Sequence, residues 1–144
     1  MADFKELRAT LQRTATTFID CCNKHTVDAI LSLRADNCKH THLPSSLDIG
    51  TYNNAEYGAF YGRFANMMKD CTCWIVDDKE MVVDVESRKV VMHAKNKGNT
   101  PLGEYENEYM WILTMTGDGK MIEEIVEFCD SAKAIELMKK HQAK

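Results

Sequence analysis

The hydrophobic pattern changes its period near Asp70, and this change constrains the fold more than any other feature of the chain. Before Asp70 most apolar residues recur every three or four positions, which is typical of amphipathic helices. After Asp70 come segments rich in Val, Ile, Tyr and Trp that are separated by turn formers, which is typical of strands. Because the helices are largely grouped ahead of the strands, the order predicts an α+β fold and argues against a doubly wound α/β fold.

Capping signals help to locate four helices. Thr26 is a suitable N-cap for the second helix, and Asn53 with Glu56 forms a capping-box pattern ahead of the third. Asp130 and Ser131 introduce a last helix after the strands. The expected helical segments cover residues 4–22, 27–33, 57–68 and 131–141.

Six segments are expected to be strands, at residues 38–43, 71–76, 81–86, 89–95, 104–115 and 120–128. Asp36 and Asn37 are expected to break the chain before the first strand, and the segment 96–103 to separate two later ones. Gly117-Asp118-Gly119 is a strong hairpin signal. The predicted architecture is a cone-shaped, curved antiparallel sheet that wraps around the N-terminal helices and encloses a pocket. We expect one domain over residues 1–144.

Composition excludes several classes of function. The net charge is -4 and the basic residues are scattered, so no nucleic-acid interface is expected. No apolar run approaches the ~20 residues of a membrane span, and the polar N-terminal sequence does not resemble a secretory signal. The six cysteines match no zinc-site spacing, so we expect reduced thiols and a cytoplasmic protein. Without a glycine-rich phosphate loop or a metal motif, no cofactor is expected.

The strand at 104–115 predicts the wall of a pocket. Strand alternation places Tyr105, Asn107, Tyr109 and Trp111 on one face and three glutamates on the other. Aromatic rings beside an amide suit an apolar cavity with a few hydrogen-bonding groups, because buried Tyr hydroxyls require partners. The alternative is that these side chains only fill the core.

Glu127 and Arg34 are the candidate charged groups. Glu127 shares a strand face with Glu123 and Ile125, and its carboxylate is either exposed at an edge or held in a cavity. In an apolar cavity its pKa rises until it can exchange a proton near neutral pH. Arg34 follows the second helix, where it either satisfies terminal carbonyls or points inward toward a carboxylate or a substrate oxygen. Glu127 is the expected partner of an inward Arg34.

Three other side chains are weaker candidates. Glu56 already has a structural role in the capping box. His40 and His42 are two positions apart on a strand and so share a face, which would allow a metal pair. No carboxylate at a fixed spacing accompanies them, so we expect no metal and instead a histidine that lines the pocket.

Four local strings resemble one group of proteins. They are RADNCKH from Arg34, LPSSL from Leu43, GEYENEY from Gly103 and VEFCDS from Val126. Together with the order of elements, they resemble small fungal secondary-metabolism proteins in the SnoaL-like branch of the nuclear-transport-factor-2-like superfamily. This group includes meroterpenoid ring isomerases and an indole-alkaloid semipinacolase. The resemblance covers nearly the whole chain and departs at Asp36, where a proline is expected.

The resemblance implies a cofactor-independent isomerase or cyclase. Its reaction would be an acid–base skeletal rearrangement, either a ring isomerisation or a semipinacol-type 1,2-shift. Its substrate would be a bulky, largely apolar polycycle, namely a meroterpenoid, a polyketide or an indole alkaloid. The resemblance also implies a homodimer. The implied catalytic residues are Arg34 and Glu127, and the expected substrate-binding residues are Tyr105, Tyr109, His40, Glu56, Asn107 and Trp111.

Two alternatives stay open at this point. One is a non-catalytic, metabolite-binding domain of the same fold, since one fold hosts many functions. An Arg–Glu pair inside an apolar cavity favours an enzyme, because a binding protein gains little from it. The other is a protein-interaction module that uses the open face of the sheet, which the three glutamates on that face argue against.

Overall fold

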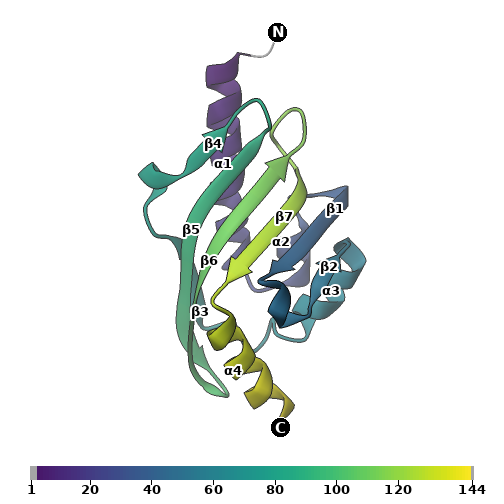
Figure 1. Cartoon of the computed structure of the whole chain (residues 1–144), viewed down its shortest axis with the longest axis vertical. Helices are drawn as coiled ribbons and strands as arrows, with labels where there is room; N and C mark the ends of the chain where they lie inside the picture. Colours follow the sequence, from purple (N-terminus) through teal and green to yellow (C-terminus); the bar gives the residue numbers. More distant parts are fainter. Residues whose placement is uncertain (1–2, 144) are drawn as a thin grey trace.

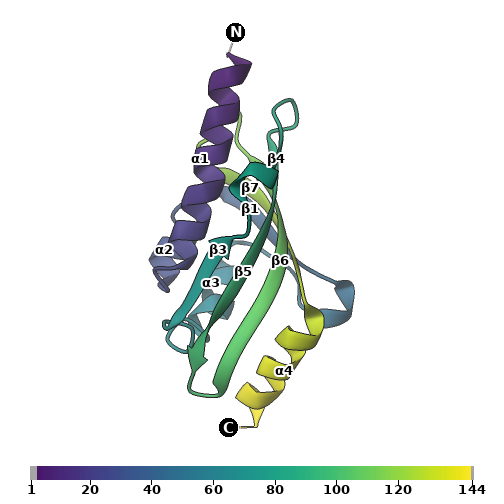
Figure 2. The same cartoon turned by 90° about the vertical axis from the view of Figure 1, so that its left-hand side faces the viewer.

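The computed structural model describes residues 3–143 and shows one curved sheet with helices packed along one side and at one end. In Figure 1 the strands β5, β6, β7 and β1 lie in front of α1 and α2, and Figure 2 shows α1 running along one side of the sheet. α1 begins and α4 ends at opposite ends of the molecule. The predicted α+β class and the curved sheet around N-terminal helices are confirmed.

The helices begin at the caps that the sequence indicates. Thr26 caps α2 and Asp130 caps α4 through side-chain oxygens that accept backbone N–H bonds. Asn53 and Glu56 close a capping box at the start of α3. The helices are α1 (Phe4–Cys22), α2 (Val27–Leu31), α3 (Asn54–Gly62) and α4 (Ser131–Gln142), with short 3₁₀ turns η1 (Ser45–Leu47) and η2 (Asp78–Glu80).

Seven strands form the sheet in the order β2-β1-β7-β6-β5-β3, and β4 pairs with β5 beside this path. They are β1 (Arg34–Leu43), β2 (Gly50–Tyr52), β3 (Cys71–Ile75), β4 (Val82–Asp84), β5 (Lys89–Thr100), β6 (Gly103–Met115) and β7 (Ile122–Cys129). β1 pairs with β7 in parallel, which departs from the antiparallel sheet that the sequence predicts, whereas the other paired strands are antiparallel. A parallel pair needs a long connection, and here most of the chain lies between the two strands.

Several boundaries differ from those that the sequence predicts. The third helix ends at Gly62 and the chain continues in turns, so the helical spacing marks a helix only up to Tyr61 and not from Phe64 to Met68. Asp36 and Asn37 lie inside β1, which pairs with β7 from Arg34 onward through an irregular register. β5 extends past Lys95 to Thr100, so the expected break at 96–103 narrows to a tight turn.

The last strand contains an irregularity that changes which side chains face inward. Its pairing with β6 shifts register between Thr114 and Met115, and Ile122 and Ile125 are both fully buried. Because a shift of one residue exchanges the two faces of a strand, Glu123 lies outside and bonds to Arg88. The prediction that Glu123 shares a face with Ile125 is therefore wrong.

The core lies between α1 and the concave face of the sheet. α1 contributes Leu11, Ala15, Phe18 and Ile19, which pack on buried side chains of β1, β5, β6 and β7. This packing fills the α1 end of the concave face and leaves space at the end nearer α3 and α4. Within residues 3–143, no helix has the length and apolar character that crossing a membrane requires.

Candidate active site

The inward face of β6 lines two chambers that meet at Glu127. The α1 chamber has a volume of about 120 Å³ and the α4 chamber about 140 Å³. Their shared walls are Tyr61, Tyr109 and Glu127. The α1 chamber is completed by Cys22, His25, Ile30, Tyr57, Cys71, Cys73, Asn96 and Trp111. The α4 chamber is completed by His42, Leu47, Ile49, Phe60, Phe64, Tyr105, Asn107, Cys129, Ala134, Leu137 and Met138.

Glu127 is the acidic side chain in the walls of both chambers. Its side chain is 17% exposed, and it comes from β7 opposite Trp111 of β6. Burial raises the pKa of Glu127 above its ordinary value, while His42 and Arg34 act in the opposite direction. A carboxyl group with a raised pKa holds a proton more readily and can exchange it with a ligand.

His40 is hydrogen-bonded to Glu127 and lies outside the chamber walls. Its Nε2 lies 2.9 Å from Glu127 Oε1, and its side chain is fully buried. The imidazole is stacked against the rings of Tyr57, at 4.1 Å, and of His42, at 4.5 Å. Burial and the Arg34 charge lower the pKa of His40 well below its ordinary value. Among the residues that the structure describes, His40 lines neither chamber, so its predicted contact with substrate finds no support in its position.

Arg34 is buried close to this pair but does not bond to Glu127. Its Nε donates to the carbonyl of Ile30 at 3.1 Å, which is the terminal-carbonyl role considered from the sequence. Its guanidinium lies over the Tyr57 ring, 4.1 Å from the ring centre. Nη1 and Nη2 have no hydrogen-bond partner within residues 3–143. The expected Arg34–Glu127 pair is thus replaced by a His40–Glu127 pair, with Arg34 behind Tyr57 and acting on both through its charge.

His40, His42 and Glu127 are also the residues that could hold a metal ion. Their ligand atoms lie within 4.8 Å of one another, and two imidazoles with one carboxylate suit zinc or iron. Two features of the cluster oppose a dication. The imidazole planes are nearly parallel, at 12°, so their nitrogens do not converge on one point, and Arg34 adds a permanent positive charge. We therefore assign no metal to this cluster.

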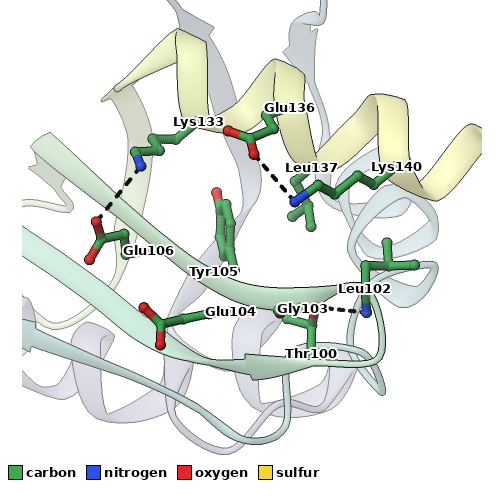
Figure 3. Close-up of a pocket in the computed structure, with 10 residues that line it drawn as sticks. All are labelled: Thr100, Leu102, Gly103, Glu104, Tyr105, Glu106, Lys133, Glu136, Leu137 and Lys140. Atoms are coloured by element: carbon green, nitrogen blue, oxygen red, sulfur yellow. Dashed lines mark hydrogen bonds and ion pairs between the residues drawn. The ribbon is translucent and has the colours of Figure 1, made fainter.

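The tyrosines supply neutral hydroxyl groups to the cavity. Burial raises the pKa of Tyr61 and of Tyr105 to about 12, and that of Tyr57 and Tyr109 well above its ordinary value. Tyr105 lines both the α4 chamber and an outer groove of about 100 Å³, whose lining residues are drawn in Figure 3. The charges beside that groove pair with one another, as Lys133 with Glu106 and Lys140 with Glu136. The groove therefore leaves little free charge for a ligand.

Two asparagines that face each other across β5 and β6 have different roles. Asn107 lines the α4 chamber, but its amide donates to the Tyr105 hydroxyl and accepts from the backbone of Glu108 and Asp130. Asn96 lines the α1 chamber, and its Oδ1 is buried without a partner in the described chain. Asn96 is missing from the residues expected at the site because the strand was expected to end at Lys95. The alternation Val90, Met92, Ala94, Asn96 is the signal that identifies it.

Two other expected site residues lie in contrasting places. Trp111 lines the α1 chamber, and its Nε1 is buried without a partner within the described residues. Glu56 is exposed, and its carboxylate accepts the backbone N–H of Asn53 at 3.0 Å. Among the described residues Glu56 is in neither chamber wall, so the capping box accounts for it.

Curated relatives of this chain come from fungal biosynthesis clusters. No family model matches the chain. Austinoid biosynthesis cluster protein J of Aspergillus calidoustus is 37% identical over 131 residues, which are 90% of this chain and 79% of that protein. Austinoid biosynthesis clusters protein F of Emericella nidulans is 32% identical over 137 residues, which are 95% of this chain and 77% of that protein.

Several solved structures superpose closely on this chain. BvnE pinacolase from Penicillium brevicompactum superposes with a TM-score of 0.87 at 31% identity, covering 95% of this chain and 97% of that one. PrhC from Penicillium brasilianum also gives 0.87, at 28% identity and with coverages of 95% and 91%. A SnoaL-like protein of unknown function from Burkholderia thailandensis gives 0.64 at 19% identity, with coverages of 85% and 96%, and shares the fold alone. The SnoaL-like resemblance predicted from the four strings is confirmed.

Proposed function

This chain belongs to the family of the austinoid biosynthesis cluster proteins, and from that premise we propose that it is an isomerase of fungal-type secondary metabolism. The proposed reaction is a cofactor-independent, acid–base skeletal rearrangement, either a ring isomerisation or a semipinacol-type 1,2-shift. The similarity to a pinacolase supports this reaction class. The observation that carries the proposal is a buried carboxylate with a raised pKa at the junction of two chambers.

Glu127 is the proposed proton carrier. Its position in both chamber walls puts it beside the middle of any ligand that occupies both. The carboxylate would take a proton from a substrate carbon or hydroxyl and return it to another atom of the same molecule. The product is then an isomer of the substrate, and no electrons or groups are exchanged with a third component. General acid–base catalysis of this kind contributes about 10²–10⁴-fold to rate.

Arg34 is the proposed stabiliser of the oxygen on which negative charge develops. Its Nη atoms have no partners among the described residues, which is costly for a buried guanidinium. Arg34 is in neither chamber wall, so its charge would act across the Tyr57 ring on an oxygen bound in the α1 chamber. A fixed positive charge in an environment of low dielectric constant acts most strongly where charge develops in the transition state. Trp111 Nε1 and Asn96 Oδ1 offer one further donor and one further acceptor.

The proposed substrate is a bulky, largely apolar polycycle with a few oxygens. Each chamber is smaller than the ~300–1,000 Å³ of an ordinary ligand site, and so are the two together, so such a molecule would have to occupy both chambers and widen them. Tyr61 and Tyr109 stand at the junction and would have to move slightly to join the chambers. The aromatic walls would then fold the substrate toward one product.

The test is conversion of austinoid-pathway intermediates and of other oxygenated polycycles by purified protein without added cofactor. The proposal expects a product of unchanged mass and altered skeleton, also in the presence of a chelator. Loss of activity on chelation with recovery on adding zinc would contradict it and assign the His40, His42 and Glu127 cluster to a metal. Binding of these compounds without conversion would favour the metabolite-binding alternative.

A further inference from the structure

Glu127 has two carboxylate oxygens, and the structure gives them unequal surroundings. Oε1 lies 2.9 Å from His40 Nε2. Oε2 has no hydrogen-bond partner among residues 3–143 and belongs to a side chain in the walls of both chambers. A ligand in the cavity therefore meets a carboxyl group of which one oxygen is already engaged.

The surroundings of His40 select one tautomer. Its Nδ1 is buried without a partner in the described chain. A proton on Nδ1 would leave a buried N–H donor unpaired, which costs more than leaving a lone pair there. The neutral form with its proton on Nε2 avoids that cost and donates to Glu127 Oε1.

A charged imidazolium is disfavoured at this position. It would also carry the unpaired Nδ1–H, in a fully buried side chain near the guanidinium of Arg34. The same groups make His40 a poor acceptor of the proton that Glu127 gains. Proton transfer from Glu127 to His40 is therefore opposed by burial, by charge and by hydrogen bonding together.

Packing fixes the direction in which His40 donates. The ring packs against His42, at an interplanar angle of 12°, and against Tyr57, at 16°, and the centres of those two rings are 5.9 Å apart. β1 and β7 run in parallel with His40 opposite Ile125 and His42 opposite Glu127, so the donor and acceptor belong to adjacent paired strands. Turning Nε2 away from Glu127 would disturb the contacts of this ring with His42 and Tyr57.

We propose that His40 is a positioning residue that stays neutral, donates its Nε2–H to Glu127 Oε1 and leaves Oε2 as the oxygen that exchanges a proton with the ligand. The catalytic meaning of this arrangement rests on the proposed function, but the hydrogen bond does not. His40 then orients the carboxylate and favours its charged form, since a donor to a carboxylate stabilises the ionised state. Other titratable groups around the pair come from every neighbouring element, namely Arg34 and His42 of β1, Tyr57 and Tyr61 of α3, Cys22 of α1, Cys73 of β3, Tyr105 and Tyr109 of β6, and Cys129 of β7.

The first test needs no substrate. Two-bond ¹H–¹⁵N NMR of the histidine-labelled full chain, with His40 assigned from His40→Gln, reports the tautomer between about pH 5 and pH 8. The expected result is a neutral ring with its proton on Nε2 across this range. A proton on Nδ1, or conversion to imidazolium within the range, would overturn the proposal even if the enzyme is active.

The second test uses the pH profile of kcat for two variants. His40→Leu removes the donor, so kcat is expected to fall about 10- to 100-fold and the acid limb to move to higher pH. His40→Gln retains an N–H donor of similar reach and is expected to restore most of kcat and the original limb. His93→Leu, in the exposed pair on the outer face, is the matched control.

Equal profiles for wild type and His40→Leu would overturn the proposal, and so would a His40→Gln variant no better than His40→Leu. If His40→Leu does not fold, the profile of His40→Gln and the NMR result decide. Absence of turnover in the wild type would contradict the proposed function and leave the tautomer result standing.

Discussion

Each face of the sheet carries a histidine bonded to a glutamate, and the two pairs have opposite surroundings. On the concave face His40 bonds to Glu127, with side chains 0% and 17% exposed. On the outer face His93 bonds to Glu108, with side chains 39% and 54% exposed, and Lys95 lies 3.9 Å from the same carboxylate. The residue types are identical, so any difference in chemistry comes from burial and from neighbours.

Burial turns the inner pair into a candidate acid–base centre. Without water, desolvation raises the pKa of Glu127 and lowers that of His40, and Arg34 and the stacked rings add fixed constraints. An exposed pair is screened by water and typically contributes about 0–1 kcal/mol to stability. The comparison teaches that the pairing of histidine with glutamate does not identify a site, whereas the cavity around it does.

The largest difference between the two faces is expected in turnover. Glu127→Gln keeps the shape of the side chain but removes the exchangeable proton, so kcat should fall about 10²–10⁴-fold. Glu108→Gln makes the same change on the outer face and should leave kcat unchanged within about twofold. Product formation by both variants, with circular dichroism as the folding control, checks this. Equal activities would remove the functional distinction between the faces.

Arginine gives a second contrast of the same kind. Arg34 is buried, with two nitrogens that have no partner among residues 3–143, whereas Arg88 is partly exposed and bonds to Glu123 at 3.3 Å. Arg34→Met should lower kcat about 10²–10³-fold, because a fixed charge near the reacting oxygen is lost. The variant should stay folded, since methionine replaces a costly buried charge. Arg88→Met is the control, and a comparable loss of kcat there would contradict a specific role for Arg34.

The sequence predicted the inner face of β6 well because strand alternation is a local property. Tyr105, Asn107, Tyr109 and Trp111 all turn inward, as expected. It failed on β7, where the register shift near Met115 turns Glu123 outward. Such a shift depends on the partner strand and leaves no trace in the spacing of one segment.

The partners within the site also depend on tertiary packing. Sequence reasoning brought Arg34 and Glu127 together, and they do lie in the same buried region, but the parallel pairing of β1 with β7 puts His40 on the carboxylate instead. No local pattern predicts that pairing, because the two strands are separated by most of the chain. Asn96 was missed for a simpler reason, since β5 runs beyond its expected end.

A smaller difference between the two faces is expected in KM, which reports how well the substrate is bound. Asn96 faces the α1 chamber, and its carbonyl oxygen has no partner in the described part of the chain. The next residue, Lys97, faces outward, and its Nζ lies 3.7 Å from Glu104 Oε1. Asn96→Ala should raise KM about tenfold with little change in kcat, as expected for one lost hydrogen bond to a ligand. Lys97→Ala should alter neither constant. A steady-state comparison of the two variants decides, and an unchanged KM in Asn96→Ala would exclude it from the binding site.

The smallest expected effect is on the pH dependence of stability. The pKa of Glu127 is raised in the folded protein, so above pH 4.5 the folded state keeps a proton that the unfolded state releases. The wild type therefore loses stability as pH rises from 4.5 to the pKa of Glu127 in the folded protein, and this range is the pH window. Glu127→Gln has no such loss. The free energy of unfolding of the variant minus that of wild type should increase by about 1.4 kcal/mol for each pH unit of the window. Urea unfolding at several pH values measures this, with Glu108→Gln as the baseline, and a difference that decreases with pH would contradict the sign.

A direct titration of the Glu127 carboxyl group tests the central claim, which is that the cavity makes this glutamate an acid–base group. ¹³C NMR of the protein labelled at glutamate side chains follows each carboxyl group, and the Glu127 signal is assigned by its absence in Glu127→Gln. The account predicts a midpoint clearly above the ordinary value of 4.5. A midpoint at or below that value would show that Glu127 is a permanently charged carboxylate and would contradict its role as the proton carrier.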